Sequence, residues 1–365
     1  FCWKINNKKD MKNIVALLTV CIGFSASSAN PYIAKVYDFV PAPGQFVNVM
    51  PEYEEGDDKE AMLNKVAENI CGNDIDGASP GMISLGAWGG YVVFGFDHPV
   101  VNVKGEYDFK IYGNAFAATG SSSGGSCESG IVMVSYDENG NGVPDDKWYE
   151  LAGSEYGKSE TIHDYKMTYY KPAADHVANP DPANRYITDR TYAKWEDNKG
   201  NSGYVMKNSF HSQAYWPEWI EDETMEFEGS RLADNATDKS GNGSNYVLSF
   251  YDYGYVDNQP NASDPGFNIE WAVDSDGKSV NLPAVHFIKV YSAINQYCGW
   301  IGETSTEICG GEDLHPDTIL SGIESNFTCV NEPVEYYTVQ GVKVENPVNG
   351  IFVKRQGNKV TKVIL

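Results

Sequence analysis

Residues 90–96 read Gly-Tyr-Val-Val-Phe-Gly-Phe, and this short apolar run indicates the kind of fold most clearly. Similar runs follow at residues 107–112 (YDFKIY), 131–136 (IVMVSY) and 147–151 (KWYEL). Each run is rich in β-branched and aromatic residues and is bounded by Gly, Pro, Asn or Asp, which predicts a series of strands. Apolar and polar residues alternate only partly, which favours strands that are covered on both faces.

A second strand-rich block begins near Met225 and contains predicted strands at residues 246–251, 267–273 and 285–291. Only residues 60–69 (EAMLNKVAEN) place apolar side chains at helical spacing. Strands and helices therefore do not alternate, which argues against a parallel α/β sheet. The sequence predicts an all-β protein, with a jelly-roll or β-sandwich body, few helices and a small C-terminal β-domain.

The two ends of the chain differ in character from the body. Residues 1–10 resemble an upstream extension, and residues 11–29 combine a positive start, an apolar core and small residues, which predicts a secretory signal peptide. Lipid attachment at Cys21 is the alternative for this segment. The body is expected at residues 30–310, as one unit or as two lobes at about 30–160 and 200–310. A linker at 311–332 then leads to a β tail at 333–365.

The formal net charge of −24 restricts the partners of the chain. Nucleic acid is an unfavourable partner because phosphates require basic patches. The excess of acidic over basic residues fits a protein of the cell exterior. No stretch after the signal region is apolar for long enough to span a membrane. Cysteines are sparse: Cys298–Cys309 and Cys309–Cys329 are candidate disulfides, and free buried thiols are the alternative.

The strongest chemical motif is the loop from Asp137 to Asp146 (DENGNGVPDD). Its oxygen-bearing side chains have the spacing of a calcium loop, with a glycine where the chain must turn and a backbone carbonyl at the seventh position. The twelfth position holds Trp148 instead of the bidentate Glu of an EF-hand, so we expect a strand–loop–strand site. A metal-free Asn/Gly turn is the alternative. The predicted calcium ligands are Asp137, Asn139, Asn141, Val143, Asp145 and Asp146.

Two further features bear on ligands and catalysis. Tyr215, Trp216 and Trp219 could stack on a sugar or another flat ligand, and structural packing is the alternative. Gly120–Gly124 has the G-x-S-x-G pattern but lies in a Ser/Gly-rich run, so we expect a flexible loop there and no nucleophile. No His-Glu-x-x-His motif occurs, and no catalytic residues can be assigned. An enzymatic role is therefore less favoured than binding.

Several of these segments resemble the secreted "cell surface protein" family of Bacteroidetes. The resemblance covers roughly residues 80–315, and its clearest segments are residues 95–100 (GFDHPV), 107–116 (YDFKIYGNAF), 130–137 (GIVMVSYD), 148–154 (WYELAGS), 254–258 (GYVDN) and 299–303 (GWIGE). Residues 339–344 and 350–353 resemble the short C-terminal β-domains that end many exported Bacteroidetes proteins. The resemblance implies an exterior β-sandwich protein, located near outer-membrane uptake systems that include cobalamin-type ones.

Together these features favour an exported, calcium-stabilised surface protein that captures a small molecule, such as a cobamide, or a glycan for an uptake complex. A glycan-active hydrolase and an adhesive or structural surface protein are the two alternatives, because fold-level patterns alone do not separate these functions.

Overall fold

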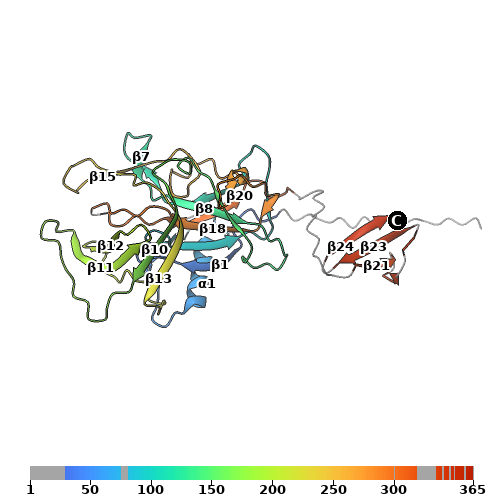
Figure 1. Ribbon diagram of the computed structural model, residues 1–365, viewed down its shortest axis with the longest axis horizontal. Coiled ribbons are helices and arrows are strands. Elements are labelled where there is room, and N and C mark those ends of the chain that lie inside the picture. Colours follow the sequence, from blue (N-terminus) through green and yellow to red (C-terminus); the bar gives the residue numbers. More distant parts are fainter. Residues whose placement is uncertain are drawn as a thin grey trace, which may run out of the picture.

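The computed structural model describes residues 29–74, 81–299, 301–318 and 334–364, apart from 339–340, 345–346, 349 and 357–358 in the last range. The predicted signal peptide lies outside these residues except for Ala29. The fold is nearly all β, with 37% of the chain in strands and 5% in helices, and none of its antiparallel sheets is closed (Figure 1). This confirms the predicted all-β class and is consistent with a sandwich.

A six-stranded sheet forms the centre of the body. Its order is β1 (Lys35–Val40), β3 (Tyr91–Gly95), β18 (Phe287–Ser292), β8 (Gly130–Ser135), β9 (Trp148–Leu151) and β16 (Ala272–Val273). The middle strands β3, β18 and β8 are almost entirely buried, which explains why their sequences do not alternate. β18 pairs with β3 on one side and with β8 on the other, so the two strand-rich blocks share one sheet. The expected alternative of two separate lobes is therefore wrong.

A four-stranded sheet carries the second core. Its order is β12 (Ser202–Asn208), β11 (Ile187–Asp197), β10 (Ile162–Tyr170) and β13 (Thr224–Arg231). One face of β10 and β13 packs on Trp88 and its neighbours, and the other face is exposed. The sequence pattern does not indicate β11 and β12, because charged and polar residues interrupt both strands.

Shorter strands complete the body. One sheet has the order β14 (Ala236–Asp238), β15 (Tyr246–Ser249), β7 (Gly124–Ser126) and β6 (Phe116–Ala117). Three two-stranded ladders pair β17 (Ala284–Val285) with β4 (Val100–Val101), β19 (Glu307–Ile308) with β2 (Ile83–Ser84), and β20 (Gly310–Asp313) with β5 (Phe109–Tyr112). Because β20 pairs with β5, the body continues to Asp313, slightly past the expected start of the linker.

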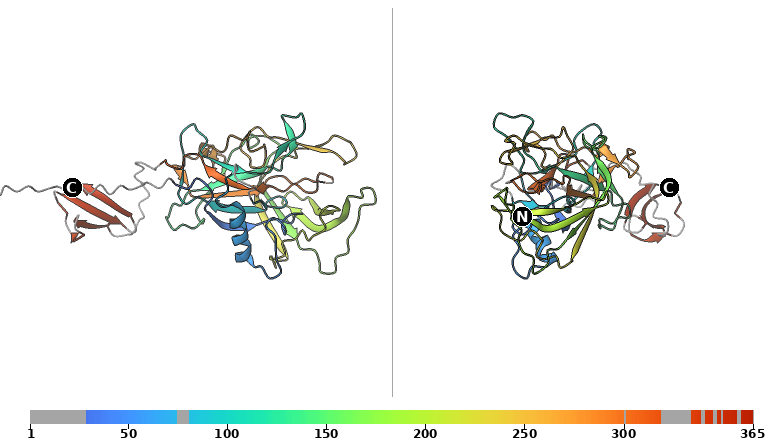
Figure 2. Two further views of the ribbon diagram at one scale, coloured as in Figure 1. Left: turned by 180° about the vertical axis from the view of Figure 1, so that it is seen from behind. Right: turned by 60° about the vertical axis from the view of Figure 1, so that its left-hand side comes forward.

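Helix α1 (Lys59–Ile70) confirms the single predicted helix. The side chain of Asp58 caps it by accepting the N–H of Ala61, and its apolar residues Met62, Val66 and Ile70 are buried. The helix lies beside β1 in both Figure 1 and Figure 2. The predicted strand at 267–273 is partly wrong: Ile269–Trp271 form the 3₁₀ turn η1, since the side chain of Asn268 accepts the N–H of Glu270 and starts the turn.

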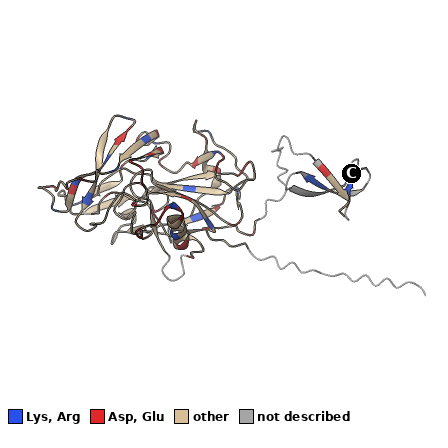
Figure 3. Ribbon diagram, turned by 90° about the horizontal axis from the view of Figure 1, so that it is seen from below, with Lys and Arg blue, Asp and Glu red and all other residues tan. Residues whose placement is uncertain are grey.

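The C-terminal unit is a separate antiparallel sheet, with the order β22 (Lys343–Val344), β21 (Val334–Thr338), β23 (Ile351–Gln356) and β24 (Lys359–Ile364). Its strands match the four that the sequence predicts. In the body, acidic and basic positions are interspersed along the strands and loops (Figure 3). Within the described parts of the chain, no helix has the length and apolarity needed to cross a bilayer.

The cysteines of the described residues are reduced. Cys71, Cys127, Cys298 and Cys309 are free, so the candidate Cys298–Cys309 disulfide is not formed. Cys329 lies outside the described residues. Burial raises the pKa of the Cys298 thiol to about 12, so this side chain behaves as a small apolar group.

Candidate functional site

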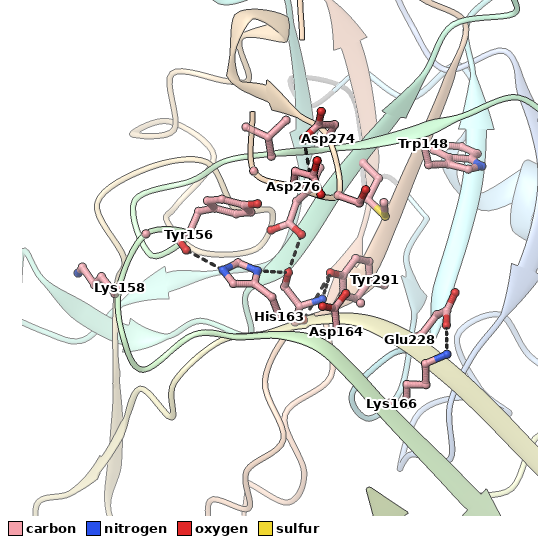
Figure 4. A pocket seen from close by; sticks show the side chains of 18 residues that line it. Trp148, Tyr156, Lys158, His163, Asp164, Lys166, Glu228, Asp274, Asp276 and Tyr291 are labelled. Carbon is pink, nitrogen blue, oxygen red and sulfur yellow. Dashed lines mark hydrogen bonds and ion pairs between the residues drawn. The ribbon is translucent and has the colours of Figure 1, made fainter. Parts of the chain in front are cut away.

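A cavity of about 750 Å³ opens between the central sheet and the four-stranded sheet. We call it the first cavity. β9 contributes Glu150 and β13 contributes Ser230. Trp148 of β9 and His163 and Asp164 of β10 also line the cavity (Figure 4). The turn after β16, residues 274–277, lines the cavity as well. The volume falls within the range of roughly 300–1,000 Å³ that is usual for small-molecule sites.

A β-bulge places two consecutive side chains in this cavity. In a regular strand, neighbouring residues point to opposite faces. The pairing of β10 with β13 shifts register between Ile162 and Tyr165, and Asp164 has φ of 50°. Both His163 and Asp164 are therefore exposed, and both line the cavity. Bulges commonly redirect side chains beside functional sites. Neither residue could be singled out from the sequence, since no local pattern marks the bulge.

A hydrogen-bonded chain of three side chains crosses one wall of the cavity. The Ser230 hydroxyl lies 2.7 Å from Oε2 of Glu150 and 3.0 Å from Nδ1 of His163. Nε2 of His163 lies 3.0 Å from the carbonyl oxygen of Tyr156, so this nitrogen carries a proton. Ser230 has one hydroxyl proton for two acceptors. Both hydrogen bonds of Ser230 can therefore form only when the three side chains together hold one additional proton, on either Glu150 or His163.

Burial favours the proton on Glu150. Loss of solvation raises the pKa of this carboxyl to about 7, although the Ser230 hydrogen bond lowers it. The pKa of the Tyr156 hydroxyl, whose backbone carbonyl accepts the His163 hydrogen bond, is also raised, by burial and by the nearby Glu150. The order Glu150–Ser230–His163 is not that of a serine-hydrolase triad, in which the histidine lies between the serine and the carboxylate. The Ser230 hydroxyl is therefore not arranged as a nucleophile.

The lining of the cavity is negative overall. Two ion pairs neutralise its lysines: Lys166 with Glu228 at 2.6 Å, and Lys158 with Glu155 at 2.8 Å. With the proton on Glu150, the lining still has four other acidic residues against two lysines, and they are Asp164, Glu228, Asp274 and Asp276. This balance disfavours an anionic ligand, because like charges repel where solvent is partly excluded.

The predicted calcium loop connects β8 to β9 and is held by its own side chains. The Asp137 carboxylate accepts backbone N–H groups of Gly140 (2.7 Å), Asn141 (3.1 Å) and Gly142 (2.9 Å). The side-chain oxygens of Asn139 and Asn141 accept the N–H groups two residues further on. The structure thus brings the oxygens of the first, third and fifth positions together around one short turn.

The later predicted ligands are also drawn toward this turn. The Asp145 carboxylate accepts the side-chain N–H groups of Asn139 and Asn141, at 3.1–3.2 Å, and Asp146 accepts the N–H of Glu138. The Val143 carbonyl accepts the N–H of Asp145 at 2.8 Å. Among the described residues, no group of three or more His, Cys, Asp or Glu side chains is placed to hold a metal ion. The loop's donor set instead mixes carboxylates with amide oxygens, which are ligands that calcium accepts.

The three predicted aromatic ligand residues differ in burial. Tyr215 is 0% exposed and Trp216 is 3% exposed, and both belong to the core beneath the four-stranded sheet. Trp219 is half-buried and packs against Phe39, with ring centroids 6.0 Å apart. Trp216 also lines a cavity of about 480 Å³ together with Tyr53 and Tyr192. Tyr215 therefore serves core packing, and ligand binding by Trp216 and Trp219 stays a prediction.

No protein-family model matches the chain, and no curated protein matches its sequence.

Proposed function

We propose that this protein is an exported surface protein that binds a small neutral or cationic ligand in the first cavity. The observation that carries the proposal is the cavity of about 750 Å³ with its negative lining and its redirected His163 and Asp164. Trp148 and Tyr156 add aromatic surface to the polar groups, a mixture that suits glycans and small polar molecules. A ligand as large as a cobamide would be enclosed only in part. The exterior location rests on the signal-like segment and on the family resemblance.

The proposal includes a structural calcium ion in the loop from Asp137 to Asp146. The proposal rests on the donor set of one short turn: the carboxylates of Asp137 and Asp145 and the amide oxygens of Asn139 and Asn141 are of the kind that calcium accepts. β9 starts directly after this loop and supplies Trp148 and Glu150 to the cavity. A bound ion that stiffens the loop therefore also fixes the start of β9.

The test compares thermal melts of the wild type and of Trp148→Ala in calcium. The ligand panel contains neutral glycans, polyamines and cobalamin. We expect one neutral or cationic ligand to raise the melting temperature of the wild type and not that of Trp148→Ala. The control is Phe116→Ala, which removes an aromatic ring that is 62% exposed and is not part of the cavity lining. A ligand shift that survives in Trp148→Ala, or no shift with any ligand, would refute binding in this cavity.

A second candidate function is glycan hydrolysis. It is favoured by one observation: Glu150 has a pKa of about 7 and shares its cavity with the carboxyls of Asp164 and Asp274. A carboxyl that stays protonated near neutral pH can act as a general acid. Turnover of a glycan by the wild type, lost in Glu150→Gln and declining as the pH rises above 7, would select hydrolysis over binding alone.

A further inference from the structure

A second, smaller cavity of about 310 Å³ lies between the β11–β12 hairpin and the segment that follows β18. We call it the second cavity, and none of its lining residues lines the first. The hairpin contributes Trp195, Gly203, Val205 and the exposed Arg190, whose guanidinium donates to Oδ1 of Asn179 at 3.0 Å. The segment after β18 contributes Tyr297 and Glu303. The hairpin side is thus apolar apart from this guanidinium, and the other side is polar.

Three polar atoms in this wall are buried without a hydrogen-bond partner in the described part of the chain. They are Oε2 of Glu303, the hydroxyl oxygen of Tyr297 and Oγ1 of Thr304. The other carboxyl oxygen of Glu303, Oε1, accepts the N–H of Gln45 at 2.5 Å, which holds the side chain in place. Glu303 is only 5% exposed. An unpaired buried polar group is unfavourable, so native proteins seldom keep one without a role.

The backbone places two of these side chains on the same side. Tyr297 and Glu303 face each other across an isolated antiparallel bridge. Directly opposed residues of an antiparallel pair project to the same face, and their side chains are neighbours. Their electrostatic interaction is consistent with this proximity: burial is the main cause of the raised pKa of Tyr297, and the negative charge of Glu303 raises it further. Both side chains line the second cavity.

The opposite wall is shaped by Trp195. A Cβ atom added at Gly203 would lie 2.5 Å from the Trp195 ring, so the ring packs directly on the glycine backbone of the facing strand. A flat apolar wall opposite two hydrogen-bonding groups matches the face of a sugar ring, whose C–H groups pack on an aromatic ring while its hydroxyls bond at the edge.

We propose that the second cavity is a binding site for a neutral polyhydroxylated ligand about the size of one monosaccharide, held by Glu303, Tyr297 and Trp195. Sugar hydroxyls both donate and accept, so they satisfy the orphaned oxygens of Glu303 and Tyr297. Burial raises the pKa of Glu303 to about 8, so this carboxyl is neutral at pH 7 and does not select a cation. The volume lies at the lower end of the range for ligand sites and suits one ring.

The test is saturation-transfer NMR and calorimetric titration of the full chain at pH 7. The probes are glucose, galactose, mannose and xylose, with glucosamine and glucuronate as charged analogues. We expect at least one neutral sugar to bind, more tightly than either charged analogue. Tyr297→Phe should weaken that binding about tenfold, the effect of losing one hydrogen bond to a ligand. Binding of none of the neutral sugars, or tighter binding of a charged analogue, would overturn the proposal.

Two controls separate loss of binding from folding defects and from unrelated surface changes. The Tyr297 hydroxyl has no hydrogen-bond partner among the described residues, so Tyr297→Phe should keep or raise the melting temperature of the wild type. Phe116→Ala changes an exposed ring that lines neither cavity, so it should leave sugar binding unchanged. If Tyr297→Phe binds the sugar as well as the wild type does, or if Phe116→Ala weakens binding as much as Tyr297→Phe does, the second cavity is not the site.

Discussion

The raised pKa of Glu303 predicts how the free energy of unfolding should change with pH. Its folded pKa is about 8, raised chiefly by burial, against an ordinary value of 4.5. The folded state therefore holds this proton more tightly than the unfolded state does. The stability that the group contributes is complete below about pH 4.5 and is lost as the pH rises toward 8. One pKa unit corresponds to about 1.4 kcal/mol, so roughly 2–3 kcal/mol should be lost between pH 5 and pH 7.

The perturbation that tests this is Glu303→Gln, which keeps the shape of the side chain and an oxygen that can accept the Gln45 N–H. Urea denaturation at pH 5, 6 and 7 gives the free energy of unfolding of each protein. We expect the variant to gain roughly 2–3 kcal/mol relative to the wild type between pH 5 and pH 7. Other buried carboxyls titrate in both proteins and cancel in this difference. The exposed Glu221 provides the control, and Glu221→Gln should run parallel to the wild type. Equal pH slopes for Glu303→Gln and the wild type would refute the reasoning.

Two further predictions concern the loop and the close packing at the first cavity. Asp137→Ala should weaken calcium binding and remove the calcium-dependent rise in melting temperature. An ion at 100 times its Kd stabilises the folded protein by about 2.7 kcal/mol. The prediction fails if the difference between melts in calcium and in EDTA is equal in the wild type and the variant. Gly229→Ala should destabilise by about 1–3 kcal/mol, because the new Cβ would lie 2.7 Å from the Tyr291 hydroxyl, whereas Gly157→Ala has open space and should change little in the same urea assay.

Features that depend on neighbouring residues could be predicted from the sequence. The strands at 90–96 and 131–136 and the helix at 60–69 were recognised from side-chain periodicity and bounding turn residues. The loop from Asp137 to Asp146 was predicted as an oxygen-rich turn, and its hydrogen bonds connect residues two to eight positions apart. The calcium ion itself stays a prediction.

Features that depend on distant residues could not be predicted. Only the tertiary structure decides that β18 lies between β3 and β8, because strand pairing across about 150 residues leaves no local trace. The two cavities likewise depend on residues that are distant in the sequence. The bulge at His163 arises from a register shift against β13, and Tyr297 meets Glu303 only once the chain has folded back. Local sequence thus determined which segments form strands and turns. Long-range packing decided which polar groups line a cavity, since burial and the loss of hydrogen-bond partners exist only in the folded chain.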